Sequence, residues 1–356
     1  MSVAASELDA YVLTDEEKEA VRKAFLGIEY DPKGSLDYIS KVRTAAYKNF
    51  PSGLISHLEL QKHSDVSFSI FENLPVDNVF GSPLNDANSQ DYKDGCLSEN
   101  IVVAFGSVIA EPYSIYFEGK NIVNNLVPHP VARNDFTGIG SAVDLDFHTE
   151  NAAQAYDECG DISPVGLLLS GVRGDPNNVG VGPKTLLSDA RKALKLLDDK
   201  DIEILYSKSF FIKDPYRWRG KYFGDRSDNK DVFLRPVLKG PVDHPHVTVA
   251  FYPDMVQPVG PEADLAYTNF HEAIKHVSIG IDIEPGRLVY VNNRFTLHSR
   301  EKFNATQDEN GRPYRWVQRV FVTNNLWNFR SFTRYGDRVY DPSTHSPSAY
   351  QVEVMR

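Results

Sequence analysis

The stretch AVDLDFHTE, residues 142–150, constrains the fold more than any other, because apolar and polar side chains alternate from Val143 to His148. Such alternation is typical of a strand with one face on a core, since successive strand side chains point to opposite faces. The apolar set predicted to face the core is Val143, Leu145 and Phe147. The opposite face then carries four polar side chains: Asp144, Asp146, His148 and Glu150.

Segments with strand and helix patterns alternate along the rest of the chain. A capping-box sequence at residues 14–17 predicts the start of a helix. Further helices are predicted over residues 34–50, 98–112, 186–206 and 263–277. Strands are predicted within 112–128, around a turn, and over 164–170, 246–253, 287–293 and 315–325, with loops around short strands at 65–95. This mixture predicts one α+β domain built around a β-barrel or sandwich.

Length and charge limit the kinds of partner that this chain can have. With 356 residues and a formal net charge of −11, it lacks the cationic surplus that nucleic acids or anionic membranes attract. Cys96 and Cys159 are too few for a disulfide framework, and the first residues do not resemble a signal peptide. No apolar run approaches the roughly 18 residues of a membrane span. We therefore expect a cytoplasmic protein with a small-molecule ligand, and we leave its oligomeric state open.

The polar face of the first strand offers a metal-site hypothesis. His148 and Glu150 stand at i and i+2, the spacing at which one strand supplies two ligands on one face. His298, just beyond another predicted strand, is the candidate third ligand. Two histidines and a carboxylate form the facial triad of non-haem Fe(II) oxygenases. The plain alternative is a solvated strand face with structural histidines, because an H-x-E pair alone is a weak signal.

A pair of arginines favours the metal hypothesis over the plain alternative. Arg315 and Arg319 stand at i and i+4 on a predicted strand and therefore share a face. Arginine suits bidentate binding of carboxylates, as a dicarboxylate co-substrate beside iron would require. A zinc hydrolase using the same histidines is a further alternative, since three protein ligands also suit catalytic zinc. It would leave the arginines unexplained and lacks a general base with a matching context.

Three segments together resemble a known family: HTENA at 148–152, NNRFTLHSREKF at 292–303 and RWVQRVFV at 315–322. They are similar to the Fe(II)/2-oxoglutarate oxygenases of the clavaminate synthase-like, TauD-related group, which includes hydroxylases of free arginine, asparagine and lysine. The resemblance covers roughly residues 98–325. It implies a double-stranded β-helix (jelly-roll) core at about 96–330, with flanking helices. A helical region at about 1–95 and an extension at 331–356 complete a single domain.

The resemblance also implies roles for individual residues. Iron would be bound by His148, Glu150 and His298. Arg315 would bind the distal carboxylate of 2-oxoglutarate, with Thr185 contacting the same co-substrate, and Arg319 would meet the α-carboxylate of the substrate. With O2 as oxidant, the family reaction converts 2-oxoglutarate to succinate and CO2 and oxidises an unactivated C–H bond. Because the related halogenases lack this carboxylate, Glu150 argues against halogenation.

The substrate is expected to be an amino acid or an N-substituted amino acid of natural-product metabolism. Arginine hydroxylases hold the guanidinium with two acids spaced D-x-D, and here Asp254 keeps one acid while Tyr252 replaces the other. Glu118 lies near the place where relatives bind the substrate amine. Hydroxylation is the predicted outcome. One alternative is radical cyclisation or desaturation of a bulkier N-substituted amino acid, as in kainoid synthases, with Arg173 or Arg294 binding its extra carboxylates. The other alternative is a catalytically inactive jelly-roll protein that only binds a ligand.

Overall fold

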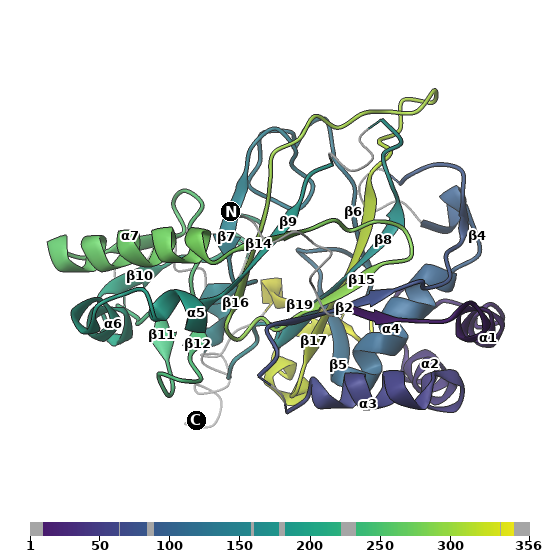
Figure 1. Cartoon of the computed structure of the whole chain (residues 1–356), viewed down its shortest axis with the longest axis horizontal. Helices are drawn as coiled ribbons and strands as arrows, with labels where there is room; N and C mark the ends of the chain where they lie inside the picture. The colour runs from purple at the N-terminus through teal and green to yellow at the C-terminus, as the bar shows by residue number, and fades with distance from the viewer. Residues whose placement is uncertain are drawn as a thin grey trace, which may run out of the picture.

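A large and a small β-sheet occupy the middle of the molecule, with helices on two sides (Figure 1). The computed structural model describes residues 10–63, 65–83, 89–157, 160–177, 182–221, 233–334 and 336–344. The expected mixture of helices and strands is confirmed. No helix within these ranges is long and apolar enough to cross a membrane.

The larger sheet is mostly antiparallel and is centred on three buried strands. Its strands, in spatial order, are β1 (Ala10–Val12), β2 (Phe68–Glu72), β15 (Leu288–Val291), β8 (Gly166–Arg173), β17 (Trp316–Thr323), β5 (Glu111–Ile115), β19 (Val339–Asp341) and β18 (Thr333–Arg334), with β6 (Asn124–Leu126) also pairing with β17. All residues of β15 and β17 are buried, as are all but the last of β8. Buried on both faces, these strands read as nearly continuous apolar runs rather than alternating ones.

The smaller sheet contains the alternating segment that opened the sequence. Its order is β14 (Ile279–Ile281), β9 (Thr185–Asp189), β16 (Thr296–Arg300) and β7 (Leu145–His148). Leu145 and Phe147 of β7 are buried as predicted, whereas Val143, which precedes the strand, is half-buried. Strands β16 and β7 run antiparallel, and their register pairs His298 with His148. Two histidines separated by 150 positions in the sequence therefore become direct neighbours.

Of the four N-terminal helices, the wholly buried α4 (Leu97–Ile109) packs on the larger sheet, and the other three pack against α4: α1 (Asp15–Phe25), α2 (Leu36–Asn49) and α3 (Ser52–Leu60). The capping box at Thr14 and Glu17 is formed as predicted. Three later helices lie beside the smaller sheet, where α5 (Ala190–Leu194) and α7 (Pro261–His276) contact its strands and α6 (Asp199–Tyr206) packs on α7 (Figure 1). Short elements complete the described chain: β3 (Asn78–Val79), β4 (Lys93–Asp94), β10 (Phe210–Ile212), β11 (Leu238–Lys239), β12 (His246–Val247), β13 (Val256–Pro258), and 3-10 turns at Ser89–Tyr92, Ala152–Tyr156, Leu326–Phe329 and Pro342–Thr344.

Two predicted elements are wrong in type or extent. The helix expected over 186–206 begins as strand β9, because residues 185–189 pair with both β16 and β14. The remainder is divided between α5 and α6, where the side chain of Asp198 caps a new helix. The strand expected over 246–253 is regular only at His246–Val247. Beyond it, Val249 and Phe251 bond to the chain around the end of β7, which leaves no continuous ladder.

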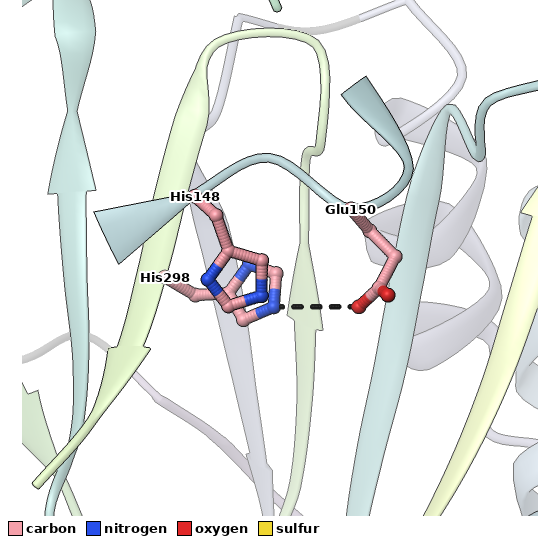
Figure 2. Close-up of side chains that lie close together, drawn as sticks. All are labelled: His148, Glu150 and His298. Atoms are coloured by element: carbon pink, nitrogen blue, oxygen red, sulfur yellow. Dashed lines mark ion pairs between the residues drawn. The ribbon is translucent and has the colours of Figure 1, made fainter. Parts of the chain in front are cut away.

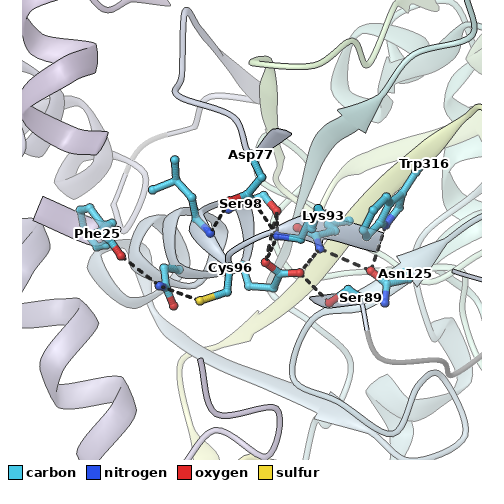
Figure 3. A network of polar contacts seen from close by, with 12 residues as sticks. Phe25, Asp77, Ser89, Lys93, Cys96, Ser98, Asn125 and Trp316 are labelled. Atoms are coloured by element: carbon cyan, nitrogen blue, oxygen red, sulfur yellow. Dashed lines mark hydrogen bonds and ion pairs between the residues drawn. The ribbon is translucent and has the colours of Figure 1, made fainter. Parts of the chain in front are cut away.

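A buried ionic network ties α4 to the back of β17 (Figure 3). Lys93 Nζ lies 2.5 Å from carboxylate oxygens of both Asp77 and Glu99, and all three side chains are buried. Asp77 also accepts hydrogen bonds from backbone N–H groups in the first turn of α4. Glu99 Oε1 accepts a hydrogen bond of 2.6 Å from Gln318 Nε2 on β17. The network therefore fixes the strand that carries Arg319 on its other face.

Candidate metal centre and adjoining cavity

The side chains of His148, Glu150 and His298 converge at one end of the smaller sheet (Figure 2). The two imidazole rings, paired across β7 and β16, have centroids 4.2 Å apart. Glu150 Oε2 lies 3.6 Å from His298 Nε2. One potential ligand atom from each residue lies within 4.8 Å of the others, so the cluster can hold a metal ion.

Glu150 reaches this position from a turn rather than from the strand predicted to carry it. Strand β7 ends at His148, and Glu150 is two residues further on, where the chain turns. Its backbone N–H donates a 2.7 Å hydrogen bond to Asn293 Oδ1, and Asn293 Nδ2 donates to the carbonyls of Glu150 and Pro164. The next residue, Asn151, has a left-handed φ of 53°. The hydrogen bonds with the Asn293 amide, rather than the two-residue period of a strand, therefore direct Glu150 toward the metal cluster.

Neighbouring groups orient His148 and keep it neutral. Its Nδ1 lies 2.8 Å from the carbonyl oxygen of Asp146, which leaves Nε2 free for a metal. The carboxylate of Asp146 in turn contacts His271 Nε2 of α7 at 3.0 Å. Burial and the adjacent His298 lower the pKa of His148 to about 3. A neutral imidazole is the form that binds metals.

Glu150 is ionised despite its burial. Burial alone would raise the pKa of its carboxyl, but the charge of Arg319, with smaller contributions from both histidines, lowers that pKa well below its usual range. Arg319 Nη1 lies 3.2 Å from Glu150 Oε2. The ionised carboxylate of Glu150 and the neutral imidazole of His148 are thus present in the forms that coordinate a divalent ion, and His298 adds a second imidazole beside them.

The metal cluster opens into a cavity of about 900 Å³, including its mouth. Arg315, directly before β17, lines one part of it together with Arg300 and Thr185. Burial, and then the charge of Arg300, lower the pKa of Arg315 to about 10. Arg315 forms no ion pair with any described residue. The negative charge of Glu284 partly offsets the lowering of the Arg315 pKa. A half-buried guanidinium that faces a cavity and has no ion pair among the described residues can bind an anionic ligand.

Arg319 and Glu118 form a second polar group in the cavity, next to the metal cluster. Arg319 Nη2 lies 3.1 Å from Glu118 Oε2 and 3.3 Å from Asn124 Oδ1. Glu118 also accepts from Arg217 Nη1 at 3.3 Å and from Trp218 Nε1 at 3.2 Å. The structure therefore brings together seven of the eight residues singled out in the sequence: His148, Glu150, His298, Arg315, Thr185, Arg319 and Glu118.

Asp254 is the residue that the structure does not bring to the cavity. It has a left-handed φ of 60°, its side chain is 54% exposed, and it forms ion pairs with Lys213 and Arg219 on the outside. Tyr252, two residues earlier, lines the cavity instead. The alternative cations Arg173 and Arg294 are likewise not among the lining residues, and Arg173 pairs with Asp308 at 2.9 Å.

Sequence reasoning missed two arginines of the cavity, Arg300 and Arg217. Arg300 stands two residues after His298 on β16, so the strand period that related the first pair could have found it. Arg217 lies in an irregular segment, and no local pattern distinguishes it from other arginines. Asn293 was also missed, because its role depends on a contact with a residue 143 positions away.

Two imidazoles and one carboxylate that leave part of a metal ion open define the facial-triad class of oxygenase sites. Residues 97–321 match the family described as Taurine catabolism dioxygenase TauD, TfdA family. This match covers more than half of the chain, and the chain belongs to that family. The predicted family and enzyme class, a non-haem iron dioxygenase dependent on 2-oxoglutarate, are confirmed.

Individual relatives agree with this assignment. The chain is 25% identical to L-asparagine oxygenase of Streptomyces coelicolor over 264 residues, covering 74% of this chain and 72% of the relative. It is 26% identical to clavaminate synthase 2 of Streptomyces clavuligerus over 196 residues, or 55% of each chain. The structure of asparagine oxygenase with Fe(II), 2S,3S-3-hydroxyasparagine and succinate matches with a TM-score of 0.77 at 22% identity, covering 93% of this chain and 99% of that one. The non-heme iron oxygenase OrfP, with Fe, succinate and (3S)-hydroxy-L-Arg, matches with a TM-score of 0.77 at 20% identity, covering 94% and 100%. At these identities the structural matches show a shared fold.

Proposed function

We propose that this protein uses Fe(II), 2-oxoglutarate and O2 to hydroxylate an amino acid or N-substituted amino acid. The observation that carries the proposal is the cluster of His148, Glu150 and His298 at the wall of a cavity that also contains Arg315 and Arg319. Similarity to the L-asparagine oxygenase supports an amino acid as substrate, as does 24% identity over 181 residues to an L-lysine 3-hydroxylase of Catenulispora acidiphila, covering 50% of this chain and 46% of that relative. We also propose that the two sheets form the jelly-roll core of a single domain, as the fold of the structural relatives supports.

Iron would be bound by Nε2 of His148, a carboxylate oxygen of Glu150 and a ring nitrogen of His298. The donor set fits Fe(II), because both imidazoles are buried and the orienting bond of His148 already uses its Nδ1. The buried Nδ1 of His298 has no hydrogen-bond partner among the described residues, so the side chain is not otherwise committed. When bound, iron with 2-oxoglutarate and O2 supplies the oxidising power for attack on an unactivated C–H bond.

The remaining residues would bind and orient the two organic molecules. Arg315 would bind the distal carboxylate of 2-oxoglutarate, with the hydroxyl of Thr185 donating to the same molecule and Arg300 adding positive charge. Arg319 would bind the substrate α-carboxylate, and Glu118 the α-amine. Because these two side chains already pair at 3.1 Å, a zwitterion can insert between charges of the matching signs. The substrate would then lie next to Glu150 and the metal.

The test is succinate release from 2-oxoglutarate with Fe(II) and O2, measured across a panel of amino acids with product masses. Hydroxylation predicts stimulation by one class of compound and a product heavier by one oxygen atom, whereas cyclisation or desaturation predicts the loss of two hydrogens. His298→Ala should abolish turnover. The control His276→Ala, an exposed histidine at the end of α7, should retain it. Iron binding without succinate release would favour an inactive binding protein, and wild-type turnover in His298→Ala would refute the metal assignment.

A further inference from the structure

Three aromatic rings form one wall of the cavity beside the metal cluster. Tyr252 lies edge-on to His148, with ring centroids 5.3 Å apart and an interplanar angle of 81°. Phe136 stacks parallel to Tyr252 at 6.3 Å, and Tyr216 lies 6.0 Å from it. All three rings line the cavity. A substrate held between Arg319 and Glu118 would therefore have this aromatic wall beside its side chain.

The acids of the cavity are already committed to other groups. Within the described lining, the carboxylates are Glu118 and Glu150, and both pair with Arg319. Glu118 would bind the substrate α-amine and Glu150 the metal. No lining carboxylate remains to meet a positive charge on the substrate side chain, because Asp254 lies outside and pairs with Lys213 and Arg219.

The charge balance of the cavity also opposes a cationic side chain. Its described lining contains four arginines against the two acids: Arg217, Arg300, Arg315 and Arg319. The charges of Fe(II) and the 2-oxoglutarate dianion cancel, and a zwitterionic backbone adds none, so the surplus stays positive. The aromatic wall does not act as a cation-binding cage either, because the guanidinium of Arg219 already lies 4.4 Å from the centre of the Tyr216 ring.

From this geometry we infer that Tyr252, with Phe136 and Tyr216, selects a substrate whose side chain or N-substituent has no positive charge and presents an apolar surface to the rings. The inference rests on the proposed function and narrows its substrate class. Tyr252 places a ring rather than a carboxylate on the cavity wall beside His148, so this wall offers no ion-pair partner to a guanidinium or ammonium group. Burying such a group without a partner is costly, whereas an apolar chain gains contact with the rings.

The test uses L-norleucine and L-lysine, which share a carbon chain and differ by the terminal ammonium group. Each is titrated calorimetrically, without oxygen, into the full-length protein loaded with Fe(II) and 2-oxoglutarate. We expect L-norleucine to bind more than about 10-fold more tightly to the wild-type protein and to Tyr252→Phe, which keeps the ring. Tyr252→Asp should shift the ratio by more than about 10-fold toward L-lysine, and Phe136→Asp is a second variant with the same expectation.

The control Tyr47→Asp adds the same charge at a tyrosine that is 47% exposed on α2, and it should leave the ratio unchanged. Equal or tighter binding of L-lysine to the wild-type protein, no binding of L-norleucine, or a ratio unaffected by both aspartate variants would overturn the inference. Slow succinate release without an amino acid, dependent on Fe(II) and lost in His298→Ala, reports the proposed function separately. If that release persists while L-norleucine fails to bind, only the substrate class is wrong.

Discussion

Replacing Arg315 by methionine is expected to weaken 2-oxoglutarate binding without destabilising the protein. Arg315 is half-buried beside Arg300, and its lowered pKa reflects its removal from solvent and the like charge of Arg300. In the ligand-free protein it has no ion pair among the described residues, so it is kept at a cost in folding free energy. An arginine that stabilises the fold would instead form ion pairs that raise the free energy of unfolding, and replacing it would lower that free energy.

The magnitudes follow from these contacts. A bidentate carboxylate contact contains two charge-assisted hydrogen bonds, each of about 1.5–3 kcal/mol. Losing both bonds would cost about 3–6 kcal/mol of binding free energy, and the remaining contacts from Arg300 and Thr185 would offset part of this loss. The Kd for 2-oxoglutarate should therefore rise by about 100-fold to 1,000-fold. The free energy of unfolding of the ligand-free variant should stay the same or rise, because replacing a buried charge by a matched apolar chain is often neutral or stabilising by about 1–4 kcal/mol.

Titration calorimetry of 2-oxoglutarate and urea unfolding of the ligand-free protein measure the two effects. Arg173→Met is the matched control, because Arg173 pairs with the buried carboxylate of Asp308 and lies 4.7 Å from the centre of the Tyr314 ring. It should lower the free energy of unfolding by about 1–3 kcal/mol and leave 2-oxoglutarate binding unchanged. A change in Kd below about 3-fold in Arg315→Met, or a loss of stability matching that of Arg173→Met, would refute the assignment.

Three further predictions concern the support of the site and the stability of the fold. Asn293→Ala removes the amide that bonds to Glu150 and Pro164, so it should lower the free energy of unfolding by about 1–3 kcal/mol and weaken Fe(II) binding. Denaturant unfolding measures the first effect and metal titration the second. An unchanged affinity for Fe(II) would contradict the positioning role of Asn293. Lys93→Met leaves Asp77 and Glu99 buried without their cation and should lower the free energy of unfolding by about 3–5 kcal/mol, whereas a loss below about 1 kcal/mol would show that the network is dispensable. For Asp189, burial opposes ionisation, but hydrogen bonds from Arg191 and Ser67 prevail and lower its pKa. A folded-state pKa below the unfolded value of about 3.9 means that its contribution to stability is complete above that pH and is lost as the pH falls through the folded-state pKa. The stability difference between wild type and Asp189→Asn should therefore shrink between about pH 5 and pH 2 in urea unfolding, and a difference that grows on acidification would refute this sign.

Local patterns in the sequence predicted those parts of the fold and site that depend on near neighbours. The capping box at Thr14 and Glu17 uses contacts three residues apart, and the burial of Leu145 and Phe147 follows from the strand period. Four of the candidate residues that the structure brings together could be singled out because short motifs pair His148 with Glu150 and Arg315 with Arg319. Because each motif spans only a few residues, it can be recognised in the sequence without knowing the order of the strands.

The failures depend on contacts between distant segments. Residues 186–189 have a helical pattern, yet pairing with β16 and β14 makes them a strand. Asp254 matches one acid of a D-x-D pair, but a left-handed φ and ion pairs to Lys213 and Arg219 keep it outside the cavity. No spacing in the sequence encodes these interactions, because the partners belong to segments whose arrangement only the folded chain defines.

The two faces of β17 explain why buried polar groups accompany this site. Strand β17 is buried on both faces and carries apolar side chains on each, so its hydrophobic pattern alone would tolerate a slip of one residue. Such a slip would turn Arg319 away from the cavity and place Gln318 in it. Gln318 reaches Glu99 on the helical side at 2.6 Å, while Arg319 reaches Glu118 on the cavity side at 3.1 Å. Each contact is lost if the strand moves by one position, and an unpaired buried charge is far more costly than a repacked methyl group. The buried acids on opposite sides of the strand therefore specify together which side chains face the metal cluster.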